Sequence, residues 1–355
     1  MGFVLSASTA SIANLCTHVP RRDYRLMVKR VAMFEGARER LSTRLAAVEP
    51  SMELWCFDDT GRFSHGGQSV SAEKMELDYL WLGPDLAGGK YGSLPFDVAL
   101  GCKRIEVVQT FNAGLDHPAY KQLAERDVRI CNSSAQSVAI SEYVMAHALH
   151  AIAPIEERRT LQQQREWKRT PFREIAGMHW IIVGYGPIGR ETAKRAKAFG
   201  ASITVVRRSG TRDENVDRVA TLAQLPALLP EADVIVLACP LNDETRALAN
   251  ARFFDNTRQN AILINIARGG LIEEAALLQA LDSGRLGQAV LDVFEPEPLP
   301  EASALWTHPR ILVTAHTSFD GDGTRGRWDE LFFDNLPRFL RDEVLVNEVN
   351  PTDLL

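Results

Sequence analysis

The segment from His179 to Arg208 constrains the fold of this chain more than any other part of the sequence. An apolar run at 179–183 leads into Gly184-Tyr-Gly-Pro-Ile-Gly189, and an amphipathic stretch at 190–199 follows before a second apolar run at 202–206. A strand, a glycine-rich turn, a helix and another strand in this order are typical of a βαβ unit that binds the pyrophosphate of a dinucleotide. We therefore expect a parallel sheet here, with a dinucleotide at its edge.

The three glycines of this turn are expected to have separate tasks. Gly184 permits the tight turn, Gly186 lets the backbone approach the pyrophosphate, and Gly189 lets the helix pack closely on the strand. The pyrophosphate would then lie on unpaired N–H groups at a helix N-terminus. Glycine patterns also occur in methyltransferases and in ordinary turns, so the interpretation depends on the flanking strands and helix.

The end of the second strand carries Arg207-Arg208-Ser209. Enzymes that use NAD usually have Asp or Glu at this position, where the carboxylate binds the ribose hydroxyls. Two guanidinium groups and a hydroxyl instead suit a 2′-phosphate. The prediction is NADP, with NAD as the other option; the alternative is a solvated basic turn.

Short apolar runs alternate with amphipathic stretches along the remaining chain, which predicts two successive parallel-sheet systems. The predicted fold class is α/β, with two Rossmann-like doubly wound parallel-sheet domains and a cleft between them. A single long helix is expected at 137–155, followed by a charged segment at 156–168. The expected strands are 30–34, 52–57, 77–82 and 104–109 in the first system, and 180–183, 203–206, 234–237, 261–264, 288–293 and 311–314 in the second.

The composition narrows the functional class. The net charge of −6 argues against a nucleic-acid-binding surface. The five cysteines contain no C-x-x-C pair, which favours a reducing cytoplasm over a disulfide framework or a metal site. No apolar run reaches the roughly 18 residues of a membrane span. Residues 1–28 lack a basic segment before their apolar residues, so we interpret them as an N-terminal extension rather than a signal peptide.

Three residues of complementary chemistry, Arg268, Glu297 and His316, each follow an apolar strand in the second system. Ligands collect at the carboxyl ends of strands in an open α/β sheet. An arginine there can grip a carboxylate through two hydrogen bonds, and a histidine beside a carboxylate can exchange a proton. Each residue alone has an ordinary structural explanation, as a turn cap, a loop residue or a packing residue; the three together favour catalysis.

Four segments resemble the D-isomer-specific 2-hydroxyacid dehydrogenases in order and spacing, including the 29-residue step from Arg268 to Glu297. The resemblance extends over 29–351. It departs from most members at Ala315, where they have proline, and at Thr317-Ser-Phe319, where they have a glycine-rich turn. The four segments are 108–116, the glycine loop at 184–189, 265–271 with 273–277, and 291–298 with 315–317.

The resemblance implies a role for each site residue. Arg268 would bind the substrate carboxylate and polarise the carbonyl, and His316 would be the general acid in reduction and the general base in oxidation. Glu297 would hold the histidine in its protonated form, and the amides around Ala113 and Gly114 would hold the substrate carboxylate. Residues resembling cofactor contacts are Pro187 and Ile188 on the phosphate turn, Asp292 at the nicotinamide carboxamide, and Pro240, Thr245, Ile266 and Ala267.

The family fold implies a discontinuous first domain. A flavodoxin-like substrate domain would comprise 29–134 plus 318–355, and a nucleotide-binding domain would comprise 135–317. Members of the family are usually dimers, which implies a homodimer through Ser137–Lys168.

The resulting hypothesis is a 2-keto acid reductase. Arg207 and Arg208 make the chain closest in character to NADP-linked glyoxylate/hydroxypyruvate reductases, which would reduce a small 2-keto acid to the D-2-hydroxy acid. Two alternatives stay open. One is a dehydrogenase of the same fold with another substrate, such as phosphoglycerate; the other is a dinucleotide-sensing, corepressor-like binding protein.

Overall fold

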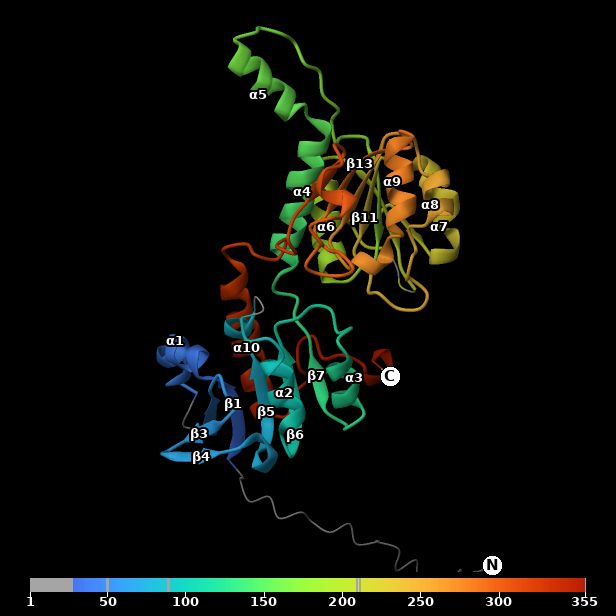
Figure 1. The fold of residues 1–355 in the computed structure, drawn as a ribbon. Coiled ribbons are helices and arrows are strands. Elements are labelled where there is room, and N and C mark those ends of the chain that lie inside the picture. The colour runs from blue at the N-terminus through green and yellow to red at the C-terminus, as the bar shows by residue number, and fades with distance from the viewer. Residues whose placement is uncertain (1–27, 49–50, 88–89, 209, 211, 355) are drawn as a thin grey trace, which may run out of the picture.

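The computed structural model describes residues 28–48, 51–87, 90–208, 210 and 212–354, and it arranges them in two lobes (Figure 1). Each lobe is built around one seven-stranded sheet with helices on both faces. The predicted α/β class with two predominantly parallel sheets is confirmed. Except for Val28, the predicted N-terminal extension lies outside the described residues, and so does Ser209.

The first sheet has the order β4-β3-β2-β1-β5-β6-β7. Its parallel part, β2-β1-β5-β6-β7, follows the 2-1-3-4-5 order of flavodoxin-like folds. An antiparallel hairpin, β3–β4, extends the edge next to β2. The hairpin and β7 were not predicted, because each of these three-residue strands contains at least one polar residue and none is a continuous apolar run. The strands are β1 Lys29–Phe34, β2 Met52–Phe57, β3 Phe63–His65, β4 Gln68–Val70, β5 Glu76–Leu82, β6 Arg104–Thr110 and β7 Arg129–Cys131.

Alternate side chains of these strands are buried on opposite faces of the sheet. Val31 and Met33 of β1 pack with α1 and α10, whereas Ala32 and Phe34 pack with α2 and α3. Both faces are therefore covered, as a parallel sheet requires. The helices are α1 Glu35–Leu45, α2 Leu94–Gly101, α3 Pro118–Ala124 and, from the far end of the chain, α10 Thr324–Leu340.

The second sheet is parallel throughout, in the order β10-β9-β8-β11-β12-β13-β14. Numbered within this lobe, that is 3-2-1-4-5-6-7, the Rossmann order with one further strand. The order reverses between β8 and β11, which is where ligands bind in such sheets. The strands are β8 His179–Val183, β9 Ser202–Val206, β10 Arg218–Ala220, β11 Val234–Leu237, β12 Ala261–Asn265, β13 Leu286–Leu291 and β14 Ile311–Val313. Of these, β10 was not predicted, for the reason that applies to β3, β4 and β7.

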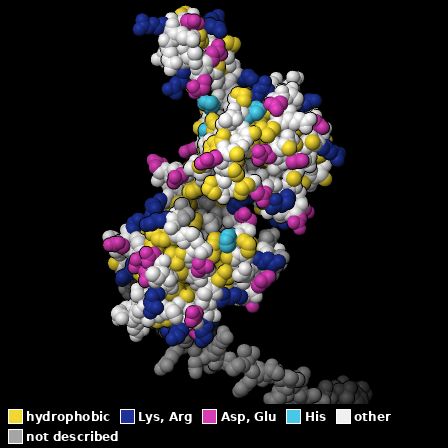
Figure 2. Space-filling model, in the orientation of Figure 1, with side chains coloured by type: hydrophobic (Ala, Val, Ile, Leu, Met, Phe, Trp, Pro, Cys, Tyr) yellow, Lys and Arg dark blue, Asp and Glu magenta, His cyan; other side chains and the backbone are white. Residues whose placement is uncertain are grey.

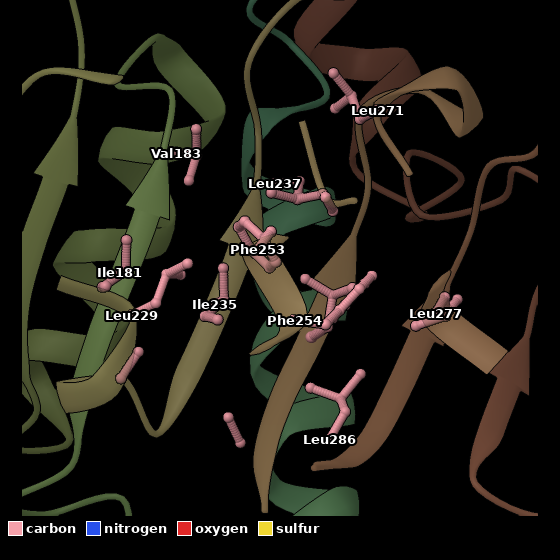
Figure 3. Packing of buried hydrophobic residues seen from close by; sticks show 14 of the residues in the cluster. Ile181, Val183, Leu229, Ile235, Leu237, Phe253, Phe254, Leu271, Leu277 and Leu286 are labelled. Carbon is pink, nitrogen blue, oxygen red and sulfur yellow. The ribbon is translucent and has the colours of Figure 1, made fainter. Parts of the chain in front are cut away.

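Helices cover both faces of the second sheet. On one face, Ile181 and Ile235 of neighbouring strands belong to one hydrophobic cluster that extends through Phe253 and Phe254 to Leu277 (Figure 3). The other face is covered by α4 and α6, which pack together. The helices are α4 Ser137–Ile152, α6 Pro187–Ala198, α7 Leu225–Leu228, α8 Ala251–Asn256 and α9 Glu274–Asp282.

The prediction of one helix at 137–155 is wrong. Helix α4 ends at Ile152, and a separate helix, α5 Ile155–Gln164, begins at an angle of 56° to it. Ala153 precedes Pro154 and adopts extended angles (φ −100°, ψ 134°), because the proline ring disfavours helical angles in the residue before it. The bend makes α5 project from the second lobe (Figure 1). Among the described helices, none is by itself long and apolar enough to cross a membrane, and only the bent α4–α5 pair reaches that length and composition together.

The chain passes between the lobes twice, once before α4 and once after β14 on the way to α10 (Figure 1). Near these crossings, Arg327 of α10 donates from Nε to the Ala135 carbonyl oxygen at 2.7 Å. Helix α10 then packs on the first sheet through Phe332 and Phe339. The domain boundaries at 134/135 and 317/318 stay a prediction.

We expect α10 to be essential for the stability of the first lobe. Phe332 is fully buried and stacks on Trp81 with ring centroids 4.2 Å apart. Replacing Phe332 by Ala should lower the free energy of unfolding by about 3–5 kcal/mol, because the cavity left behind is not refilled. Chemical denaturation followed by circular dichroism measures the change. Phe199→Ala, at a site that is 49% exposed, is the control, and a loss no larger than the control's would contradict the prediction.

Candidate active site

Two glycines of the turn after β8 are required by the protein's own backbone. Gly184 has φ +101°, and a Cβ there would lie 2.5 Å from the carbonyl oxygen of Ala238. A Cβ on Gly189 would lie 2.2 Å from the carbonyl oxygen of Gly184. Only glycine therefore allows the turn to pass so close to the end of β11 and the first turn of α6 to pack on it.

Gly186 is different, because no protein atom demands a glycine there. Its φ is −78°, and a Cβ would have nothing within 4 Å. It is the N-cap of α6, Pro187 follows it in the first turn, and Ile188 packs against the core beneath. Open space over a helix N-terminus is what an approaching phosphate needs. The residues present thus fit a dinucleotide.

Cations gather around the aromatic ring of this loop. The guanidinium groups of Arg190 and Arg207 lie over the Tyr185 ring, at 5.2 and 5.6 Å from its centroid. The Tyr185 hydroxyl donates to the carboxylate of Asp213, at 2.8 and 2.9 Å from its two oxygens. Burial and the Asp213 carboxylate raise the pKa of Tyr185, which keeps it a neutral donor. Arg208 follows Arg207 at the exposed end of β9. That Arg207 and Arg208 bind a 2′-phosphate stays a prediction, and sequence reasoning did not identify Tyr185 or Arg190.

The structure brings Glu297 and His316 together. Glu297 Oε2 is 2.8 Å from His316 Nδ1, and Glu297 Oε1 accepts the backbone N–H of Phe294 at 2.9 Å. Burial raises the pKa of Glu297, but the hydrogen bonds from His316 and Phe294 and the charges of His316 and Arg268 outweigh it, so the pKa is lowered. Glu297 is therefore an anion at neutral pH that can stabilise a protonated imidazole.

The turn that carries His316 is held from inside by Asp292, which is fully buried. Asp292 Oδ1 accepts from the Thr314 hydroxyl at 2.6 Å and from the Thr317 N–H at 2.8 Å, and Oδ2 accepts from the Ser318 N–H at 3.1 Å. The Asp292 carbonyl oxygen accepts the His316 N–H at 2.8 Å. These bonds hold His316 in a left-handed conformation, φ +51°. The predicted contact of Asp292 with a nicotinamide stays a prediction.

Arg268 follows β12 and faces the first lobe. Its Nε and Nη2 donate to Asp116 Oδ2 and Oδ1 at 2.9 and 2.6 Å. A Cβ on Gly114 would lie 2.2 Å from Arg268 Nη2, so the side chain passes directly over that glycine. The carbonyl oxygen of Ala113, beside it, accepts from Asn132 Nδ2 at 2.8 Å. The predicted substrate residues therefore meet at the junction of the two lobes, and Asp116 joins them.

The remaining predicted cofactor contacts lie at the ends of β11 and β12. Thr245 Oγ1 donates to the carbonyl oxygen of Pro240 at 2.7 Å, which fixes the loop after β11. Ile266 and Ala267 are buried directly after β12. All four lie on the sheet edge that carries the glycine loop, while their contacts with a cofactor stay a prediction.

Asp292→Asn tests the support beneath His316. The amide nitrogen would face a backbone N–H or the Thr314 hydroxyl, and one buried donor would lose its acceptor. We expect the free energy of unfolding to fall by about 1–3 kcal/mol, measured by denaturant titration. Asp334→Asn, at an exposed position on α10, is the matched control. Equal effects of the two substitutions would show that Asp292 does not support the turn.

Comparison with known proteins identifies relatives over this site. Residues 145–318 match the family model described as D-isomer specific 2-hydroxyacid dehydrogenase, NAD binding domain. Glyoxylate/hydroxypyruvate reductase A of Serratia proteamaculans is 34% identical over 177 residues, which are 50% of this chain and 56% of that protein. D-3-phosphoglycerate dehydrogenase of Bacillus subtilis is 33% identical over 215 residues, 60% of this chain and 41% of that protein. The chain thus spans about half the length of these curated relatives.

Solved structures match across both lobes. The NADPH-dependent glyoxylate/hydroxypyruvate reductase from Sinorhizobium meliloti, in complex with NADP and sulfate, is 27% identical with a TM-score of 0.72, and the match covers 92% of this chain and all of that one. A D-isomer specific 2-hydroxyacid dehydrogenase family protein from Aeromonas salmonicida is 28% identical with a TM-score of 0.71, covering 91% and 99% of the two chains. With the glycine loop, the paired Glu297 and His316, and Arg268 at the junction, these matches show that the chain belongs to the D-isomer specific 2-hydroxyacid dehydrogenase family.

Proposed function

We propose that this chain reduces a small 2-keto acid of the glyoxylate or hydroxypyruvate type to the D-2-hydroxy acid, with NADPH as the reductant. The observation that supports it most is the 2.8 Å contact between His316 and Glu297 at the sheet edge that carries the glycine loop. A histidine with its carboxylate partner is a proton donor suited to a carbonyl oxygen. Arg268, close enough to Glu297 for their charges to interact, supplies the cation for a carboxylate.

The residues divide the chemistry between them. A bound nicotinamide supplies the hydride. Glu297 engages His316 at Nδ1, which leaves Nε2 to give its proton to the carbonyl oxygen as that oxygen becomes an alkoxide. In the reverse direction Nε2 removes the hydroxyl proton. Arg268 binds the substrate carboxylate and polarises the carbonyl, with the amides at Ala113 and Gly114 as further donors.

The cations beside the glycine loop support the choice of NADPH. Arg207 lies at the end of β9, where an acidic residue would bind the ribose of NAD, and it packs on Tyr185. Arg208 is adjacent. The Sinorhizobium meliloti relative carries NADPH in its name, which agrees with this choice. NADH is expected to be the weaker donor.

A spectrophotometric panel tests the proposal. The purified chain is mixed with NADPH or NADH and with glyoxylate, hydroxypyruvate, pyruvate, 3-phosphohydroxypyruvate or a bulkier keto acid. We expect the highest kcat/KM with glyoxylate or hydroxypyruvate and NADPH, and at least about tenfold less with NADH, because one lost charge-assisted contact is worth about 1.4 kcal/mol. Equal kcat/KM for the two cofactors would contradict the NADP assignment.

His316→Ala tests the catalytic role of this histidine. Its kcat should fall by about 10²–10⁴-fold, the usual contribution of general acid catalysis, while the Kd for NADPH stays unchanged. Retention of most activity would contradict the proposed proton donor. Because one relative is named D-3-phosphoglycerate dehydrogenase, preference for 3-phosphohydroxypyruvate would support that alternative. NADPH binding without any turnover would favour a dinucleotide sensor.

We also propose a homodimer through the segment from α4 to Lys168. Helix α5 projects away from the second lobe, and Figure 2 shows Lys and Arg side chains on this projection. Trp167 is fully exposed and Phe172 is 58% exposed. Large aromatic side chains in the open on a projecting segment are typical of a contact surface, and a second copy of the chain is the partner we infer.

Light scattering after size-exclusion chromatography measures the mass. We expect about twice the 39.4 kDa of one chain, and a shift toward the single-chain mass for Trp167→Glu, which adds charge to the surface. Phe199→Glu, an exposed position on the second lobe, should leave the mass unchanged. A single-chain mass for the wild-type protein at micromolar concentration would overturn the proposed dimer.

A further inference from the structure

The ion pair between Arg268 and Asp116 joins the two lobes at the substrate position. Arg268 lies on the second lobe, directly after β12, and Asp116 lies on the loop after β6 of the first lobe. Their two hydrogen bonds run from Nε to Oδ2 and from Nη2 to Oδ1, a fork-to-fork arrangement that fixes the guanidinium plane. Both side chains are partly buried, with 31% and 41% of their surface exposed.

The guanidinium group retains donors after this pairing. An arginine has five N–H donors. Two are taken by Asp116, and Nη1 donates a third to the Ala267 carbonyl oxygen at 2.6 Å. In the described part of the chain, no further acceptor is bonded to Arg268, which leaves one N–H on each terminal nitrogen. A carboxylate accepts two N–H groups side by side, so the guanidinium group can hold a second carboxylate while Asp116 stays in place.

The local backbone is shaped for this contact. A Cβ on Gly114 would lie only 2.2 Å from Arg268 Nη2, too close for both atoms to keep their places. Any side chain at position 114 would push the guanidinium group away from Asp116. Burial raises the pKa of Asp116, but the hydrogen bond and charge of Arg268 outweigh it, so the pKa is lowered. Asp116 is therefore charged at neutral pH, within reach of the group proposed to bind an anionic substrate.

We propose that Asp116 is a positioning residue for substrate recognition: it holds Arg268 by the Nε–Nη2 edge so that Nη1 and Nη2 present their remaining N–H groups to the substrate carboxylate. This inference rests on the proposed function, since it needs a carboxylate ligand at Arg268. The alternative is that Asp116 competes with the substrate carboxylate for the same N–H groups of Arg268, so that the substrate must displace it. The two roles predict opposite changes in affinity: removing a positioning residue weakens carboxylate binding, and removing a competitor strengthens it.

Asp116→Asn distinguishes them, because it removes the charge and keeps the shape. The probe is oxalate, a dicarboxylate of similar size to a small 2-keto acid that cannot be reduced, titrated calorimetrically into the full chain with NADP bound. We expect the Kd for oxalate to rise about tenfold and the KM for glyoxylate to rise by a similar factor, while the Kd for NADPH stays within twofold of the wild type. A Kd for oxalate that is unchanged or lower in the variant overturns the proposal.

Gly114→Ala is the second variant, because it displaces the guanidinium group without removing any charge. It should raise the Kd for oxalate as Asp116→Asn does, and an unchanged Kd would overturn the proposal even if Asp116→Asn fails to fold. Gly326→Ala is the matched glycine control, since a Cβ there meets nothing within 4 Å. Glu343→Gln, which breaks the exposed Arg341–Glu343 pair, is the matched charge control. Both controls should leave the Kd unchanged.

The outcomes also separate this proposal from the proposed function. Oxalate binding that depends on Asp116, with no keto-acid turnover, would refute the reductase and retain the positioning role. Turnover of glyoxylate by the wild-type chain, together with an unchanged KM in the Asp116→Asn variant, would support the reductase and refute the positioning role. A wild-type chain that binds no oxalate would overturn the positioning role.

Discussion

The buried carboxylate of Asp292 is the constraint on which the rest of the site depends. A carboxylate with no exposed surface is stable only when its oxygens are satisfied, and here the donors are the Thr314 hydroxyl and the N–H groups of Thr317 and Ser318. These donors can converge only if the chain turns sharply after β14. That turn places His316 with a positive φ and its Nδ1 against Glu297. The orientation of His316, the proposed proton donor, thus follows from the hydrogen bonds that satisfy the buried carboxylate of Asp292.

The second dependence is between the lobes. The second lobe supplies the glycine loop, Arg268 and the Glu297–His316 pair, while the first lobe supplies the loop with Gly114 and Asp116. Among the described residues of the site, Arg268 and Asp116 form the only ion pair between the two lobes. The geometry of the proposed substrate site is therefore sensitive to how the lobes approach one another, whereas the His316–Glu297 geometry lies within one lobe. Changes in lobe closure should alter substrate binding more directly than the proton-donor pair.

Much of this organisation could be predicted from the sequence, because long strands and glycine loops leave strong patterns. The strands β8, β9, β11 and β12 and the turn at Gly184–Gly189 lie where the apolar runs and the spacing indicated. Four short strands, β3, β4, β7 and β10, could not be predicted, because each has three residues of which at least one is polar. The equally short β14 could be predicted, because it is Ile-Leu-Val throughout. The break at Pro154 had a local signal that the apolar pattern of the flanking residues obscured.

The contacts within the site were less accessible to sequence reasoning. Arg268, Glu297 and His316 were identified from their positions after strands, but Asp116 is 152 residues from Arg268 in the chain and no local pattern links them. Tyr185 occupies a variable position of the glycine motif, so its role beside Arg207 appears only when the ring and the guanidinium group are placed in space.

The open space at Gly186 bears on which of the three glycines can be substituted during evolution. Gly184 and Gly189 are held to glycine by the protein's own backbone, so their loss is felt by folding. At Gly186 no protein atom lies within 4 Å of a Cβ position, so a methyl group there would clash only with a bound phosphate. In a lineage that no longer needed its dinucleotide, this glycine would be the first of the three free to drift, while the other two persisted as marks of the fold. Of the three glycines, Gly186 is therefore the one whose replacement the fold itself would tolerate.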